Sequence, residues 1–149
     1  MKVFEIENIC YSYPDGTKAL KDLSFSVNEG EVLGIAGANG SGKSTLLMLM
    51  MGCISPLGGK IIYQGDRLSK EKLRGMRRET GLLFQDPDDQ LFLPTVWEDV
   101  AFGPRNLGLA EEEVASRVRS ALRDTGTEAL AERAPWKLSG GEKTLAALA

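Results

Sequence analysis

Histidine is absent from the 149-residue sequence, and cysteine occurs only twice, at Cys10 and Cys53. Two cysteines are too few for a disulfide scaffold, so both are expected to be free thiols in a reducing, cytosolic compartment. The longest apolar run, residues 46–51, is far shorter than the roughly 20 residues that span a bilayer, so any membrane role must come through a partner. The net charge of −3 indicates no nucleic acid partner held by bulk charge. The 42% hydrophobic content is nevertheless enough for the core of one domain.

A glycine-rich stretch, Gly37-Ala38-Asn39-Gly40-Ser41-Gly42-Lys43-Ser44-Thr45, matches the Gly-x-x-x-x-Gly-Lys-Ser pattern of a phosphate-binding loop. In such a loop consecutive backbone N–H groups wrap a polyphosphate, in backbone conformations that glycine adopts easily. The Lys43 ammonium is predicted to contact the β- and γ-phosphates of a nucleotide, and the Ser44 hydroxyl to ligate Mg²⁺. The apolar run before the loop predicts a buried strand, and the run after it predicts a helix. The phosphates would then meet a helix N-terminus, where free N–H groups favour an anion.

Hydrophobic periodicity predicts the remaining elements. Leu23, Phe25 and Val27 alternate with polar residues, which is typical of a half-buried strand. The pattern predicts strands at residues 2–13, 20–28, 31–36, 60–64 and 80–84, with a turn at residues 14–16. It predicts helices at residues 45–51, 69–78, 95–102, 111–123 and 127–133, and a last helix through residues 144–149.

Two capping boxes mark helix starts, one from Thr95 to Glu98 and the other from Ser139 to Glu142. The first of these helices is expected to end at Gly103-Pro104. The order of elements predicts an α/β fold of the P-loop NTPase type, with an N-terminal antiparallel β-subdomain and a helical insertion. We assign residues 1–149 to one nucleotide-binding domain and residues 86–137 to its helical subdomain.

Three further elements resemble the ATP-binding cassette (ABC) family. The segment Leu138-Ser139-Gly140-Gly141-Glu142 is similar to the family's signature motif, and Gln85 follows an apolar run as the family's Q-loop glutamine does. Tyr13 lies thirty positions before Lys43, where the family places an aromatic that stacks on adenine, although Tyr11 competes for that role. Residues 85–92 and 100–108 look like the ATPase subunits of energy-coupling-factor and cobalt/nickel transporters.

The resemblance implies an ATP-binding subunit that binds MgATP at an interface with a second ATPase subunit, as a homodimer or heterodimer. It implies transmembrane partner subunits, a peripheral location on the cytoplasmic face of the membrane, and no nucleic acid partner. Catalytic roles fall to Lys43 and Gln85, and metal contact to Ser44 and Gln85. The residues assigned to nucleotide binding are Tyr13, Gly37, Ala38, Asn39, Gly40, Ser41, Gly42, Lys43, Ser44, Thr45, Ser139, Gly140 and Gly141.

The sequence departs from the family pattern after the signature. No Asp-Glu strand and no switch histidine follow, and the sequence stops at Ala149 within a helix. We therefore expect a nucleotide-binding domain that is incomplete at its C-terminus, either a truncated gene product or part of a longer ATPase, with little hydrolysis of its own. The missing strand favours the alternative of a non-catalytic nucleotide-binding module. A soluble phosphate-loop kinase or GTPase is the other alternative, and the signature argues against it.

Overall fold

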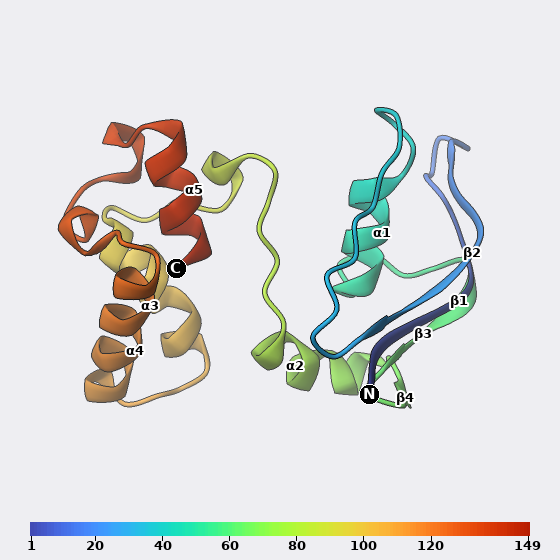
Figure 1. Cartoon of the computed structure of the whole chain (residues 1–149), viewed down its shortest axis with the longest axis horizontal. Coiled ribbons are helices and arrows are strands. Elements are labelled where there is room, and N and C mark those ends of the chain that lie inside the picture. Colours follow the sequence, from blue (N-terminus) through green and yellow to red (C-terminus); the bar gives the residue numbers. More distant parts are fainter. The chain divides into compact units, whose positions relative to one another are not determined.

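A computed structural model describes all 149 residues, which form two compact units, Met1–Leu82 and Leu83–Ala149. The first unit holds the sheet and two helices, and the second unit is helical, as Figure 1 shows. The phosphate loop and Tyr13 belong to the first unit, whereas Gln85 and the signature belong to the second.

The sheet of the first unit is antiparallel throughout and has the strand order β2-β1-β3-β4. Its strands are β1 (Lys2–Ser12), β2 (Lys18–Asn28), β3 (Gly58–Tyr63) and β4 (Asp66–Arg67). The predicted turn between β1 and β2 is present, and the Tyr13 N–H closes it by donating to the Thr17 carbonyl at 2.9 Å. The sequence therefore predicted this hairpin and strand β3 to within a few residues.

Helices α1 (Lys43–Met50) and α2 (Lys70–Glu79) complete the first unit. The residues buried in its core come from β1, β3, the two helices and the residue after α1: Phe4, Ile6, Ile9, Leu49, Met51, Ile61 and Met76. The Arg77 guanidinium joins the two helices, because it donates to the carbonyls of Met51 at 3.2 Å and Gly52 at 3.0 Å. These carbonyls follow the last turn of α1 and have no partner within the helix.

The two apolar runs predicted as buried strands, residues 31–36 and 80–84, are not strands in the structure. Val32 is 98% exposed, and Phe84 is 39% exposed. A strand needs a neighbour that pairs with its N–H and C=O groups, and neither run pairs with any strand of the sheet. The hydrophobic pattern was correctly identified, but an apolar run becomes a buried strand only when a partner strand covers it.

The second unit contains α3 (Val96–Asn106), α4 (Glu111–Asp124) and α5 (Gly140–Leu148). The unit also has three short 3₁₀ turns: η1 (Pro87–Asp89) precedes α3, whereas η2 (Glu128–Leu130) and η3 (Pro135–Lys137) lie between α4 and α5. The spacing of Val114, Val118 and Leu122 correctly predicted the buried stripe of α4, since each is at most 1% exposed. The core of this unit consists of Leu91, Val96, Ala101, Val114, Val118, Leu122, Leu138 and Ala146.

Two predicted boundaries in the second unit were wrong. Helix α3 continues through Gly103-Pro104 to Asn106; Pro104 has no N–H to donate, but Leu107 still donates to the Gly103 carbonyl at 3.1 Å. The helix predicted at residues 127–133 shortens to the single turn η2. None of the helices in either unit combines the length and the apolar character needed to cross a membrane.

Candidate nucleotide-binding site

Two glycines of the phosphate loop lie very close to other atoms of the first unit. Gly42 precedes α1 with φ of 91°, in the left-handed region, and a Cβ placed on it would lie 2.5 Å from the Ala19 carbonyl oxygen of β2. A Cβ on Gly37 would lie 2.6 Å from the Ser41 hydroxyl oxygen. The Ala19 oxygen belongs to the backbone and cannot move aside, so Gly42 has no room for a side chain, whereas the Ser41 hydroxyl near Gly37 is a side-chain end that can rotate away. The loop is therefore pressed against β2 at one end and folded on itself at the other.

The Lys43 side chain folds back across the loop. Its ammonium donates to the carbonyl oxygens of Gly37 at 2.8 Å and Ala38 at 2.9 Å. The Ser41 N–H also donates to the Ala38 carbonyl, at 3.1 Å, so the loop closes as a compact turn. An ammonium has three donors, so one N–H of Lys43 remains for another acceptor. The loop thus places a cation and a helix N-terminus on the same short segment.

Ser44 and Thr45 follow Lys43 in the first turn of α1 but have opposite surroundings. Thr45 is 5% exposed, whereas Ser44 is exposed and its hydroxyl bonds to no group in the chain. A hydroxyl is a suitable oxygen ligand for Mg²⁺, which commonly takes one or two protein groups together with phosphate oxygens. No cluster of three His, Cys, Asp or Glu side chains is placed to hold a metal ion by itself. Ser44 therefore fits a metal that arrives with a polyphosphate.

Tyr13 reaches the phosphate loop directly. Its hydroxyl lies 2.7 Å from the Thr45 hydroxyl oxygen, and its ring meets Tyr11 edge-on with ring centroids 5.2 Å apart. Tyr13 is 40% exposed, whereas Tyr11 packs against the core of the first unit. The exposed ring beside the loop is the better platform for a base, which favours Tyr13 over Tyr11; adenine stacking stays a prediction.

In the second unit, the signature begins α5 with the predicted capping box. The Glu142 carboxylate accepts hydrogen bonds from the Ser139 N–H at 2.7 Å and the Ser139 hydroxyl at 2.8 Å, and the Glu142 N–H donates to the Ser139 hydroxyl oxygen at 3.4 Å. The two hydrogen bonds that the carboxylate accepts hold the pKa of Glu142 below its usual value. The bond from the Ser139 N–H has the larger effect, and the bond from the Ser139 hydroxyl comes next. The carboxylate therefore stays charged and fixes the start of the helix.

Gly140 and Gly141 lie in the first turn of α5, and no neighbouring atom of the chain requires either of them to be glycine. A Cβ on either residue would meet nothing within 4 Å. Their N–H groups are at the beginning of the helix, where no carbonyl of the helix can accept them. The start of α5 is thus open to an acceptor that approaches from outside the unit.

Gln85 is exposed, and its side chain makes no hydrogen bond within the chain. The loop that follows it is well ordered by its own contacts, since Asp86 caps η1 by accepting the Asp88 N–H at 3.0 Å. The sequence predicted Gln85 at the end of a strand, but the structure places it in an irregular loop beside α5.

Three residues around this loop were missed by the sequence analysis. Lys143 of α5 forms an ion pair with Asp88, and the Gln90 amide donates to the Ala147 carbonyl at 2.6 Å. These partners lie 55 and 57 positions apart, so no local spacing pattern joins them. Only the packing of η1 against α5 brings them together.

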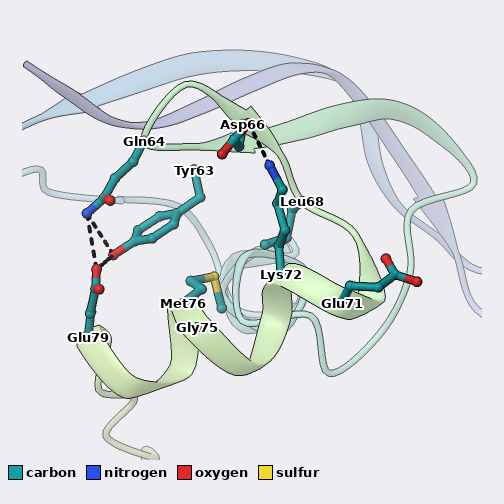
Figure 2. Close-up of a pocket in the computed structure, with 9 residues that line it drawn as sticks. All are labelled: Tyr63, Gln64, Asp66, Leu68, Glu71, Lys72, Gly75, Met76 and Glu79. Atoms are coloured by element: carbon teal, nitrogen blue, oxygen red, sulfur yellow. Dashed lines mark hydrogen bonds and ion pairs between the residues drawn. The ribbon is translucent and has the colours of Figure 1, made fainter.

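A cavity of about 310 Å³ lies in the first unit between α2 and the turn that joins β3 to β4 (Figure 2). Most of its polar side chains point toward one another in two groups, whereas Glu71 points away from both (Figure 2). The Tyr63 hydroxyl donates to the Glu79 carboxylate at 3.0 Å, the Gln64 amide donates to the same oxygen at 3.2 Å, and Lys72 pairs with Asp66 at 2.6 Å. These groups satisfy each other and hold α2 to the turn, so the cavity is explained by structural contacts.

Comparison with known proteins identifies the family to which the chain is similar. The sequence model of the family described as ABC transporter matches residues 20–149. The energy-coupling factor transporter ATP-binding protein EcfA of Methanosphaera stadtmanae is 48% identical over 149 residues, covering 99% of this chain and 54% of that protein. The protein of the same name from Methanothermobacter thermautotrophicus is also 48% identical, covering 99% of this chain and 48% of its own length.

Solved structures show the same likeness. The structure of cbiO1 from Clostridium perfringens, described as part of the ABC transporter complex cbiONQ, matches with a TM-score of 0.85 and 39% identity. That match covers 98% of this chain and 59% of cbiO1. A dimeric ATP-binding cassette bound to ADP and Pi matches with a TM-score of 0.84 and 28% identity, covering 97% of this chain and 67% of its own. The chain spans about half the length of the curated relatives it matches.

Proposed function

Because this chain belongs to the ABC transporter family, we propose that it is the nucleotide-binding part of an ATP-binding subunit of an energy-coupling-factor or cobalt-type uptake transporter. The names of its relatives EcfA and cbiO1 support this assignment. In the proposed role, MgATP binds between two ATPase subunits, and its hydrolysis drives transport by transmembrane partner subunits. The ATPase subunit would lie on the cytoplasmic face of the membrane, held there by those partners.

The observation that carries the proposal is the arrangement of the phosphate loop at the start of α1. Lys43 already bonds to two loop carbonyls, at 2.8 and 2.9 Å, so its ammonium is held over the loop. On nucleotide binding, we propose that phosphate oxygens replace these carbonyls as acceptors, while the loop N–H groups and the first turn of α1 bind the remaining oxygens. Mg²⁺, ligated by Ser44 and the phosphates, neutralises further charge.

The signature is proposed to bind the γ-phosphate held by the partner subunit's loop. The N–H groups of Gly140 and Gly141 are free for this contact, whereas the Ser139 hydroxyl must first release the Glu142 carboxylate, to which it donates at 2.8 Å. The open space above both glycines lets a phosphate approach the backbone closely. Closing the two subunits over ATP would therefore reorganise a hydrogen bond that is already present.

Gln85 is proposed to contact Mg²⁺ or the attacking water, and the helical subdomain, residues 86–137, to receive the membrane subunit. The exposed side-chain amide of Gln85 makes no hydrogen bond within the chain, so it is available to contact Mg²⁺ or water. Phosphoryl transfer depends on positioning and charge neutralisation more than on covalent chemistry, so a neutral amide suffices for orienting water. We assign the activation of the attacking water to no residue of this sequence.

The proposal is tested by measuring MgATP binding, MgATP-dependent association and hydrolysis with the complete protein. We expect the wild type to associate on adding MgATP, and Gly141→Asp to bind MgATP but stay unassociated, because its carboxylate would occupy the place of the partner's γ-phosphate. Association of this variant equal to that of the wild type would contradict the role of the signature. Preference for GTP over ATP in competition would instead indicate a GTPase.

A further inference from the structure

We propose that the loop after Gln85 is clamped to the signature helix, and that Asp88, Gln90 and Lys143 are the positioning residues of this clamp. The clamp fixes the first turn of α5, which begins at Ser139, relative to the backbone around Gln85. This inference rests on the proposed function, since it assigns a task to the contacts between two elements of the proposed ATP site.

The first contact of the clamp is the ion pair between Lys143 and Asp88, whose charged atoms are 2.5 Å apart. The Lys143 side chain is only 17% exposed, whereas the cation of every other ion pair in the chain is at least 38% exposed. The Asp88 side chain is 61% exposed, so the pair is shielded from water on its lysine side only. The partly buried Lys143 ammonium is screened less than a fully exposed cation, so losing Asp88 costs more there than at a fully exposed pair.

Lys143 belongs to the turn that presents the signature. Its backbone N–H donates to the Ser139 carbonyl at 2.9 Å, which is the first hydrogen bond of α5. The ion pair consequently acts on the same turn that holds the N–H groups of Gly140 and Gly141. Moving Asp88 would move this turn through one side chain.

The second contact of the clamp is Gln90, which uses both ends of its amide. The side-chain oxygen accepts the Phe84 N–H at 3.3 Å, and the nitrogen donates to the Ala147 carbonyl at 2.6 Å. Phe84 directly precedes Gln85, so the backbone next to Gln85 is tied through Gln90 to the second half of α5. The loop is thus anchored at two points of the helix.

The two contacts make the Gln85 loop and α5 move as one body. The Gln85 side chain itself remains free, but its backbone cannot shift without displacing α5 or breaking a contact. Coupling between sites needs such a contiguous set of packed and bonded groups. A change at Gln85 that depends on the γ-phosphate would then reach the turn that meets the partner subunit's nucleotide.

A charge-reversal cycle in the complete protein tests this inference. The variants are Asp88→Lys, Lys143→Asp and the double reversal, with Asp89→Lys as the matched control, because Asp89 is the exposed neighbour without an ion pair. We expect each single reversal to lower kcat by about 2- to 30-fold while the Kd for MgATP changes less than about 2-fold. The double reversal should recover most of kcat, and the control should keep it.

If the ion pair only stabilised the fold, the single reversals would lower the melting temperature but would not lower kcat while leaving the Kd for MgATP nearly unchanged. Equal kcat in the single reversals and in Asp89→Lys would overturn the clamp, as would a double reversal no better than the single ones. If a reversal melts below the assay temperature, Asp88→Asn is compared with Asp89→Asn, and equal kcat in the two overturns the clamp. A wild type that fails to bind MgATP would overturn the proposed function itself, a result distinct from all of these.

Discussion

Replacing Gly42 with alanine should damage the phosphate loop more than any other glycine-to-alanine change within it. Two penalties combine at this position. The residue has φ of 91°, and a Cβ would meet the Ala19 carbonyl oxygen at 2.5 Å and a Leu20 methyl carbon at 3.0 Å. The first obstacle is backbone of β2, so it cannot rotate away as a side-chain end would.

The magnitude follows from adding these penalties. A left-handed conformation costs alanine about 1–2 kcal/mol relative to glycine, and forcing atoms into a packed contact typically costs about 1–3 kcal/mol more. The lower entropy of the unfolded alanine chain returns about 0.4–1 kcal/mol. The net loss in the free energy of unfolding is therefore about 1–4.5 kcal/mol.

Gly40 provides the matched control, because its φ of 81° carries the same conformational penalty but a Cβ there meets nothing within 4 Å. Gly40→Ala should therefore cost at most about 1.5 kcal/mol. Urea unfolding of the complete protein, with the two variants beside the wild type, measures the difference. If Gly42→Ala proves as stable as Gly40→Ala, the close approach of the loop to β2 is refuted.

Two other changes probe the adenine contact and the helix start. Tyr13→Ala should weaken ATP and ADP about equally, by about 5- to 150-fold if stacking contributes about 1–3 kcal/mol, whereas Tyr11→Ala should mainly lower stability; calorimetry showing the reverse would assign the adenine to Tyr11. For Glu142, the pKa in the folded protein lies below the usual 4.5, so its stabilising effect is complete above that pH and is lost as the pH falls through the folded-state pKa. Glu142→Gln should therefore lower the melting temperature near pH 7 and converge with the wild type in acid; a difference that is constant with pH would contradict this.

The fold class was predictable because its signals are local. The phosphate loop, the hairpin and the buried stripe of α4 each depend on residues within one short segment, and the α/β fold of an ABC-type domain is confirmed by the similarity to cbiO1. The capping box at Ser139 and Glu142 was likewise confirmed, since both partners lie within one helical turn. In these segments, propensity and hydrophobic pattern point to the same structure.

What failed depended on partners that a local pattern does not specify. Residues 31–36 are as apolar as a buried strand, but strand formation is decided by a neighbouring strand. The contact between Asp88 and Lys143 joins two charges that resemble solvated surface residues in the sequence, and only the packing of η1 on α5 reveals it. Similarly, Arg77 belongs to a run of charges on α2, yet it binds carbonyls at the end of α1.

Calorimetric titration of MgATP into the complete protein and its Lys43→Ala variant is the most direct test of the central claim. Lys43 is the cation that lies across the phosphate loop, and a hydrogen bond to a charged group contributes about 1.5–3 kcal/mol. We predict a loss of about 10- to 150-fold in affinity for Lys43→Ala. Lys70→Ala, which removes an exposed lysine of α2 without an ion pair, should bind as the wild type does. Equal affinity of the wild type and Lys43→Ala would contradict the assignment of residues 37–45 as the nucleotide site.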